Sequence, residues 1–326
     1  MSNSNEIPKI AQIGCGRWGR NIARALSQHG ALAVVIDPAA DHIAEYVNGL
    51  GCRVATNIDE AFGPDIDGVA IAAPVFDHFR LASLALAAGK AVFVEKPLAL
   101  ELAEAEALAK LAEAKGLPLM VGHLLQYYPA FIRLKEVVAA GDIGEVRHIN
   151  SNRLNPGAIR TEENALWSMA PHDFSMVLSL TGQEPETVDA TAVHVVNPAI
   201  PDQFLVQMRF TSTLTAHVNV SWLSPFKEHK LVVLGTKGAI VFEDTAAERD
   251  RKLVIYRDYV DTSGPAPAFV KSAGEPIDWP TDEPLLSEMA AFLNTIKNGE
   301  ASRTGPDEAI PVLKLLHRAT AAALLG

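Results

Sequence analysis

A glycine-rich turn close to the N-terminus is the feature that most constrains the fold of this chain. A short apolar run at residues 10–13 leads into Gly14-x-Gly16-x-x-Gly19, and a helical pattern follows. In a strand–turn–helix unit of this type the first glycine permits the tight turn and the second lets a pyrophosphate approach the backbone. The third lets the helix pack on the strand. The turn therefore predicts a dinucleotide site.

An acidic residue at the end of the next apolar run bears on the choice of cofactor. The run at residues 31–36 ends in Asp37, roughly 20 residues beyond Gly14. A carboxylate at this place can accept hydrogen bonds from the ribose hydroxyls of NAD, and it would repel the additional phosphate of NADP. The pair Asp37-Pro38 would also suit a plain turn. Together with the glycines, it predicts NAD as the cofactor.

Apolar runs alternate with helical patterns over the first part of the chain. Such runs lie at residues 69–73, 91–94 and 119–121. Short apolar runs between amphipathic helices are typical of parallel strands that are buried on both faces. The pattern predicts an α/β fold in which residues 1–122 form a dinucleotide-binding Rossmann domain with a doubly wound parallel sheet.

The second part of the chain has a different pattern. Residues 206–222 are rich in alternating β-formers, and residues 231–242 form a further segment that is broken by Gly235 and Gly238. Alternation at period two predicts antiparallel strands with one covered face. We expect residues 123–326 to form an α+β domain with a large, open, mainly antiparallel sheet and a C-terminal helix free to pack back on the first domain. The other face of this sheet must also be covered, and a second subunit is the simplest candidate. A homodimer or homotetramer is therefore predicted. Residues 243–283, charged and rich in proline, are expected to be irregular.

Composition excludes several classes of partner and site. The chain carries 28 Lys and Arg against 39 Asp and Glu, for a formal net charge of −11, and no basic cluster is interleaved with aromatic residues. Nucleic acid is therefore not an expected partner. The polar start lacks the apolar core of a signal peptide, and no apolar run approaches the ~20 residues that span a bilayer, so we expect no membrane association and a cytoplasmic location. The scattered histidines and the two cysteines predict no metal site.

The stretch Glu95-Lys96-Pro97 points to chemistry, because a lysine at a strand end beside a bound nicotinamide is well placed to handle a proton. With the glycine turn, Pro74, His78, Val121-Gly122 and His172, this stretch resembles the Gfo/Idh/MocA oxidoreductases, the relatives of glucose–fructose oxidoreductase and inositol dehydrogenase. The resemblance covers nearly the whole chain. It implies an NAD(P)-dependent dehydrogenase that acts on CH–OH groups.

The resemblance also implies roles for single residues. Glu95 would bond the nicotinamide ribose, Lys96 would contact the cofactor and the substrate hydroxyl, and the Lys96-Pro97 peptide would often be cis. His172 matches the catalytic histidine, and with Lys96 it would take the hydroxyl proton; Asp173, which follows it, is assigned to the catalytic group as well. The residues expected to bind the cofactor are Gly14, Gly16, Arg17, Trp18, Gly19, Asp37, Pro74, His78, Glu95, Lys96 and Gln126.

A narrower resemblance lies in residues 152–173, which are similar to dehydrogenases of nucleotide-sugar pathways that oxidise UDP-N-acetylglucosaminuronate at the 3-hydroxyl. Arg153 and Arg160 could pair with a diphosphate or uronate, because guanidinium groups suit both, and Trp167 could line a sugar face. The plainer alternative is that these are surface arginines and a core tryptophan. The expected substrate-binding residues are Lys96, Arg153, Asn155, Arg160, Trp167 and His172.

Two other functions remain open at this point. Oxidation of free sugars, inositols or other polyols needs only the family motifs. A sensor that binds the dinucleotide without turnover would need only the motifs of the dinucleotide site. It remains an alternative because the fold alone does not settle function.

Overall fold

The computed structural model describes residues 6–157, 159–261 and 263–325. The chain forms two compact units, and both are discontinuous in sequence. One extends to Tyr127 and takes in Asp282–Leu313, whereas the other comprises Tyr128–Thr281 and the chain from Lys314 onward. The sequence-based expectation placed a single boundary after residue 122. A segment from near the C-terminus thus completes the N-terminal unit.

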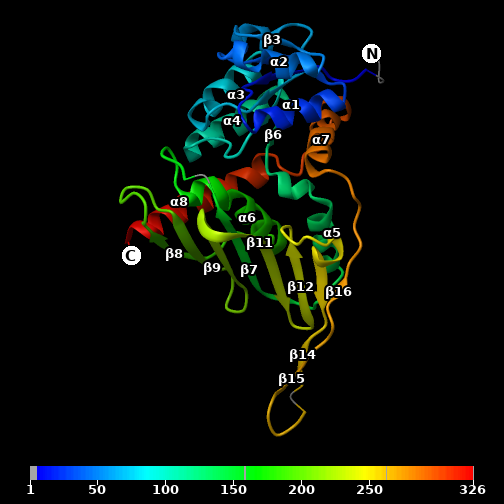
Figure 1. Ribbon diagram of the computed structural model, residues 1–326, viewed down its shortest axis with the longest axis vertical. Coiled ribbons are helices and arrows are strands. Elements are labelled where there is room, and N and C mark those ends of the chain that lie inside the picture. Colours follow the sequence, from blue (N-terminus) through cyan, green and yellow to red (C-terminus); the bar gives the residue numbers. More distant parts are fainter. Residues whose placement is uncertain (1–5, 158, 262, 326) are drawn as a thin grey trace. The chain divides into compact units, whose positions relative to one another are not determined.

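The first unit contains a six-stranded parallel sheet of order β3-β2-β1-β4-β5-β6 (Figure 1). Its strands are β1 (Ile10–Ile13), β2 (Leu32–Ile36), β3 (Arg53–Ala55), β4 (Gly68–Ile71), β5 (Ala91–Val94) and β6 (Leu119–Val121). Every residue of β1, β4 and β5 is buried, as expected for apolar runs covered on both faces. The strand order changes direction at β1, between β2 and β4. In sheets of this kind, ligands bind beyond the carboxyl ends of the strands at such a point.

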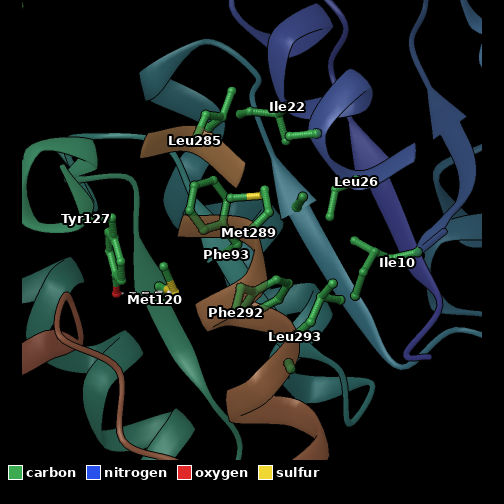
Figure 2. Packing of buried hydrophobic residues seen from close by; sticks show 14 residues of the cluster. Ile10, Ile22, Leu26, Phe93, Met120, Tyr127, Leu285, Met289, Phe292 and Leu293 are labelled. Atoms are coloured by element: carbon green, nitrogen blue, oxygen red, sulfur yellow. Dashed lines mark hydrogen bonds between the residues drawn. The ribbon is translucent and has the colours of Figure 1, made fainter. Parts of the chain in front are cut away.

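Helices cover both faces of this sheet. They are α1 (Gly19–Gln28), α2 (Ala40–Gly49), α3 (His78–Ala87), α4 (Leu102–Lys115) and α7 (Pro284–Asn298), with short 3₁₀ turns η1 (Ile58–Phe62), η2 (Val75–Asp77) and η3 (Leu124–Tyr127). Helix α7 contacts α1 and η3, although both lie far from it in the sequence. Figure 2 shows Ile22 of α1, Phe93 of β5, and Leu285, Met289 and Phe292 of α7 in one buried cluster. Burial of side chains of this size contributes about 1.5–3 kcal/mol each, so α7 stabilises the unit substantially.

The second unit contains an eight-stranded sheet of order β16-β13-β12-β11-β7-β10-β9-β8. The strands are β7 (Val146–Pro156), β8 (Thr187–Val193), β9 (Gln203–Arg209), β10 (Thr215–Ser221), β11 (Leu223–Gly235), β12 (Gly238–Glu243), β13 (Leu253–Tyr256) and β16 (Glu275–Pro276). All neighbours are antiparallel except β7 and β10. The mainly antiparallel sheet and the α/β fold class are therefore confirmed.

Helix α6 (Ala165–Thr181) covers one face of this sheet and contacts β7, β9 and β10. The buried residues of β10 toward it are Ala216, Val218 and Val220, which explains the period-two pattern of the sequence. The unit also contains α5 (Pro129–Ala139) and the C-terminal part of α8 (Pro306–Leu325). Among the described residues, none of the helices combines the length and apolar character needed to cross a bilayer.

The expectation of irregular structure at residues 243–283 is wrong in part. Strand β13 lies in this segment and extends the large sheet, because Ile255 pairs with Ile240 of β12 and is buried. A further pair, β14 (Tyr259–Asp261) and β15 (Ala268–Val270), forms a separate two-stranded ribbon. Strands of three or four residues are too short to show a periodicity against a charged background.

Candidate active site

The three glycines of the turn after β1 have three different environments. Gly14 has a φ of 88°, and a Cβ atom there would lie 2.6 Å from the carbonyl oxygen of Ala72, so only glycine permits this approach of β1 to the end of β4. A Cβ at Gly19 would lie 2.6 Å from the carbonyl oxygen of Gly14. A Cβ at Gly16 would meet nothing within 4 Å. Space for a phosphate therefore lies against the backbone of Gly16, next to the N-terminus of α1.

Gln12, which the sequence analysis did not single out, holds this turn in shape. Its fully buried side chain donates from Nε2 to the carbonyl oxygens of Gly14 at 2.8 Å and Gly19 at 2.7 Å. The two bonds join the end of β1 to the first residue of α1. A single amide within an otherwise apolar strand, two residues before the first glycine, is the sequence signal that could have identified it.

Asp37 lies at the end of β2 and is bound to the same turn. Its Oδ2 accepts a hydrogen bond from the backbone N–H of Cys15 at 2.7 Å, and its Oδ1 accepts one from Ala39 N–H at 2.8 Å. Each carboxylate oxygen retains a second lone pair for a ribose hydroxyl. Burial, followed by the charge of Asp37, raises the pKa of the Cys15 thiol to about 11, so this cysteine stays protonated and is not a nucleophile.

Glu95 connects the strand end of β5 to the glycine turn. Its Oε1 accepts a hydrogen bond from Trp18 Nε1 at 2.6 Å, and its Oε2 accepts one from the backbone N–H of Lys96 at 3.3 Å. A Cβ at Gly122 would lie 2.9 Å from Oε1, which explains the glycine after β6. The Lys96-Pro97 peptide is cis. The structure thus brings Trp18, Glu95 and Lys96 together at the carboxyl end of the sheet.

A second carboxyl group, Glu288 of α7, lies near Glu95 and was not predicted from the sequence. Its side chain is 1% exposed, and among the described residues Oε1 has no hydrogen-bond partner. Burial, together with the negative charge of Glu95, raises the pKa of Glu288 well above its ordinary value. Burial also raises the pKa of Glu95, but Lys96 and the Trp18 hydrogen bond oppose that shift. The pKa of Glu288 is therefore the more strongly raised of the two, because Lys96 and Trp18 stabilise the charge of Glu95.

His78 joins two loops at this end of the sheet. The ring is buried, with Nδ1 2.8 Å from the carbonyl oxygen of Pro97 and Nε2 3.0 Å from that of Ala73. Burial lowers the pKa of His78, and the hydrogen bonds to the Pro97 and Ala73 carbonyl oxygens oppose that shift. These two contacts hold the Lys96-Pro97 segment against the loop that contains Ala73.

Three other residues were predicted to bind the cofactor: Arg17, Pro74 and Gln126. Arg17 is exposed within the turn, and Pro74 is exposed just before η2. Gln126 is buried in η3, where its carbonyl oxygen accepts a hydrogen bond from Arg303 Nη1 at 3.4 Å. In the described ranges, no group of three or more His, Cys, Asp or Glu side chains is arranged to hold a metal ion.

The second unit contains a buried ion pair beside the predicted catalytic histidine. Asp173 of α6 is fully buried, and its Oδ2 accepts a hydrogen bond from Arg153 Nε at 2.6 Å. Its Oδ1 accepts hydrogen bonds from Ser151 Oγ at 2.6 Å and from Arg153 Nη2 at 3.4 Å. These bonds attach α6 to β7 at the residue next to His172, which is itself half-buried. Asp173 and Arg153, predicted as a catalytic and a substrate-binding residue, bind each other.

The network continues across the sheet to a histidine that the sequence did not indicate. Arg153 Nη1 lies 3.4 Å from His229 Nδ1, and His229 Nε2 lies 3.1 Å from Asn155 Oδ1. His229 is the cross-strand neighbour of Arg153 in β11. Burial, with the positive charges of Arg153 and Lys227, lowers the pKa of His229 to about 3. Only the strand register could have revealed this contact.

Arg160 and Trp167, the remaining predicted substrate residues, make local contacts. Arg160 Nε lies 3.0 Å from Glu163 Oε1 in an exposed ion pair. The half-buried Trp167 donates from Nε1 to Thr320 Oγ1 at 3.1 Å and packs edge-on against His317. Within the described part of the chain, no hydrogen bond joins either residue to the network around Arg153.

Two family models match consecutive parts of the chain. The model of the oxidoreductase family with an NAD-binding Rossmann fold matches residues 9–123, and that of the GFO/IDH/MocA C-terminal domain matches residues 131–241. The chain belongs to the Gfo/Idh/MocA oxidoreductase family. The resemblance inferred from the glycine turn and Glu95-Lys96-Pro97 is thereby confirmed.

Relatives within the family include dehydrogenases of sugars and inositols. The chain is 29% identical over 285 residues to a UDP-N-acetylglucosamine 3-dehydrogenase from Acidithiobacillus ferrooxidans, and the match covers 87% of both chains. It is 31% identical over 249 residues to an inositol 2-dehydrogenase from Rhizobium meliloti, covering 72% of this chain and 76% of the relative. A solved structure of the Acidithiobacillus enzyme aligns with a TM-score of 0.85 at 26% identity and covers 96% of each chain. The family and these relatives support a dehydrogenase.

Proposed function

We propose that this protein is an NAD-dependent dehydrogenase that transfers a hydride between a secondary alcohol of a sugar and nicotinamide. The proposed substrate is a nucleotide sugar, such as a UDP-N-acetylhexosaminuronate oxidised at C3. The observation that carries the cofactor part is the glycine turn before α1, where a Cβ at Gly16 would meet nothing within 4 Å and where Asp37 accepts a hydrogen bond from the backbone N–H of Cys15. The substrate class rests on the similarity, over 87% of both chains, to a nucleotide-sugar 3-dehydrogenase.

The residues around the glycine turn fit a bound dinucleotide. The backbone N–H of Gly16 and the first turn of α1 would hold the pyrophosphate, and Asp37 would accept hydrogen bonds from a ribose. Because Asp37 is negative and fixed by the backbone of Cys15, a phosphate on that ribose would be repelled, which favours NAD over NADP. Glu95 would take the nicotinamide ribose. When bound, the nicotinamide supplies the hydride acceptor.

We propose that Lys96 and His172 handle the proton of the reacting alcohol. Oxidation removes the C–H hydrogen with its electron pair and the hydroxyl proton, and it leaves a ketone. His172, with Lys96, would accept that proton. Asp173 would act indirectly, because its bonds to Arg153 and Ser151 fix the helix position next to His172.

A second candidate is a dehydrogenase of free inositols or other polyols. It is favoured by the 31% identity to an inositol 2-dehydrogenase, which slightly exceeds the identity to the nucleotide-sugar enzyme but covers less of the chain. A third candidate, a dinucleotide-binding sensor without turnover, requires only the first unit.

We also propose that the protein forms a homodimer or homotetramer through the open face of its large sheet. Val193 of β8, Leu205 of β9 and Leu234 of β11 are each about two-fifths exposed, at 40%, 38% and 42%. Leu205 and Leu234 stand at positions that alternate with residues buried toward α6. A second copy of the chain would remove these side chains from water. Light scattering at micromolar concentration should give a multiple of the 34.9 kDa chain mass, and a monomer would contradict this part of the proposal.

A substrate screen with NAD tests the function directly. UDP-N-acetylglucosamine, its uronate, free hexoses and inositols are each added with NAD, and NADH formation and thermal stabilisation are both recorded. We expect NADH with one of the two UDP sugars. Lys96→Met should lower turnover by about two to four orders of magnitude but retain NAD binding. Lys115→Met, at an exposed lysine of α4, should match the wild type. Turnover with inositols alone would establish the second candidate, and NAD binding without any turnover would establish the third.

A further inference from the structure

Four side chains of the second unit form a continuous chain of hydrogen bonds on one face of the large sheet. It runs from the buried carboxylate of Asp173 through Arg153 and His229 to Asn155. Arg153 and Asn155 share a face of β7 because they are two residues apart, and His229 lies directly opposite Arg153 on β11. The strand register therefore fixes the order of the four groups.

The chemistry of Asp173 and Arg153 decides the direction of every hydrogen bond in this chain. A carboxylate only accepts, and a guanidinium only donates. His229 Nδ1, which faces Arg153 Nη1, must therefore accept. The ring is neutral, because burial and the adjacent positive charges of Arg153 and Lys227 outweigh the attraction of Asp244 and lower its pKa to about 3. A neutral ring with an accepting Nδ1 carries its single proton on Nε2.

The same reasoning orients the amide of Asn155. Since His229 Nε2–H donates, the Asn155 atom 3.1 Å away must be the carbonyl oxygen Oδ1. Asn155 Nδ2 then points away from the histidine, and among the described residues it has no hydrogen-bond partner. The side chain is half-buried. Two N–H donors are thus presented in a fixed direction beside the positively charged Arg153.

We propose that His229 is a specificity-determining positioning residue, which fixes the amide of Asn155 so that Nδ2 donates to an acceptor oxygen of the substrate. This inference rests on the proposed function. A carboxylate, an amide carbonyl or a phosphate oxygen would each be recognised, and a group that presents only a donor would be rejected. The acetamido carbonyl of UDP-N-acetylglucosamine and the carboxylate of its uronate are two sources of such an oxygen.

Substitutions at His229 separate this role from a purely structural one. In His229→Gln the new amide can accept from Arg153 and donate to Asn155, so the polarity of the chain is retained. In His229→Leu the connection is lost and the Asn155 amide can rotate. We expect His229→Leu to raise KM about tenfold, mainly without an effect on kcat, which corresponds to the loss of one oriented hydrogen bond. His229→Gln should stay within about threefold of the wild-type KM, and His42→Leu, at an exposed histidine of α2, should match the wild type.

Asn155→Asp provides the complementary change, because it replaces the two donors with an acceptor. It should raise KM for the uronate more than for UDP-N-acetylglucosamine, since the new charge repels a carboxylate. Equal KM effects on both sugars would assign the contact to an oxygen that the two share, that of the acetamido carbonyl or of the diphosphate. An unchanged KM in His229→Leu, or equal increases in His229→Leu and His229→Gln, would overturn the proposal.

A spectroscopic measurement tests the hydrogen-bond chain without any substrate. In protein labelled with ¹⁵N-histidine, the signals absent from His229→Gln belong to His229. We expect a protonated Nε2 and an unprotonated Nδ1, without titration between about pH 5 and pH 8. A proton on Nδ1, or a charged ring, would refute the inference even if the dehydrogenase activity is established. If no sugar reacts, this spectrum still decides the hydrogen-bond polarity, so failure of the function and failure of the chain are distinguishable.

Discussion

The variant Glu288→Gln should be more stable than the wild type, and this difference in the free energy of unfolding should increase as the pH rises. The folded protein keeps a proton on Glu288 because burial and the charge of Glu95 raise the pKa of Glu288, whereas the unfolded chain releases that proton above an ordinary pKa of 4.5. The stability contributed by the bound proton is therefore complete below pH 4.5 and is lost as the pH rises toward the folded-state pKa. Glutamine has nearly the same shape and carries no charge at any pH.

The magnitude follows from proton linkage. Each pH unit between the two pKa values changes the free energy of unfolding by about 1.4 kcal/mol per proton. The advantage of Glu288→Gln over the wild type should grow by up to that amount per pH unit above pH 5. For a unit of this size, about 1.4 kcal/mol corresponds to roughly 3–5 °C in Tm. Parallel melting curves at pH 5, 6, 7 and 8, without cofactor, measure the difference.

Glu283→Gln provides the matched control on the same helix. Glu283 immediately precedes α7, is 43% exposed and is paired with Arg24, so its substitution should give a Tm difference that does not grow above pH 6. A pH-independent difference for Glu288→Gln, or one that falls with pH, would show that Glu288 is ionised in the folded state. The assignment of a proton to Glu288 in the folded protein would then be wrong.

Four further substitutions test the remaining assignments. Asp37→Ser should reduce the preference for NAD over NADP by about tenfold or more in measured Kd values, and tighter NADP binding by the wild type would reject the role of this carboxylate. Lys96→Met and His172→Ala should each lower turnover by about two to four orders of magnitude, with a double variant little worse than the worse single one; near-normal turnover in His172→Ala would remove it from the mechanism. Asp173→Asn should destabilise the second unit by about 3–5 kcal/mol in denaturant unfolding, because it leaves the buried Arg153 without its counter-charge, and a change below about 1 kcal/mol would contradict the buried pair.

The sequence predicted those features that are set by neighbours along the chain. The turn with Gly14, Gly16 and Gly19 has a fixed spacing because it is a strand–turn–helix unit, and a backbone of that shape requires glycine where a Cβ would collide. The parallel sheet followed from apolar runs that are buried on both faces. The large sheet followed from alternation in strands of seven or more residues such as β9 (Gln203–Arg209).

The features that were missed depend on contacts between distant parts of the chain. Glu288 lies in a helix of ordinary composition, and its unusual environment arises only because α7 packs against the sheet near Glu95. His229 acquires its partner through strand register, which no local pattern encodes. Arg153 was singled out by its residue type, yet only the fold reveals that its guanidinium is bound to Asp173.

The placement of α7 has a consequence for how the protein is made. The first unit needs Leu285, Met289 and Phe292 to complete its core around Phe93. During translation, the residues up to Tyr127 emerge long before these side chains, since Tyr128–Thr281 must be synthesised in between. At roughly 5–20 residues per second, that interval lasts on the order of ten seconds or more. During that time the apolar surface around Phe93 stays uncovered in the nascent dinucleotide-binding unit. Exposed apolar surface of this kind promotes aggregation, so this unit would benefit from chaperones at the ribosome.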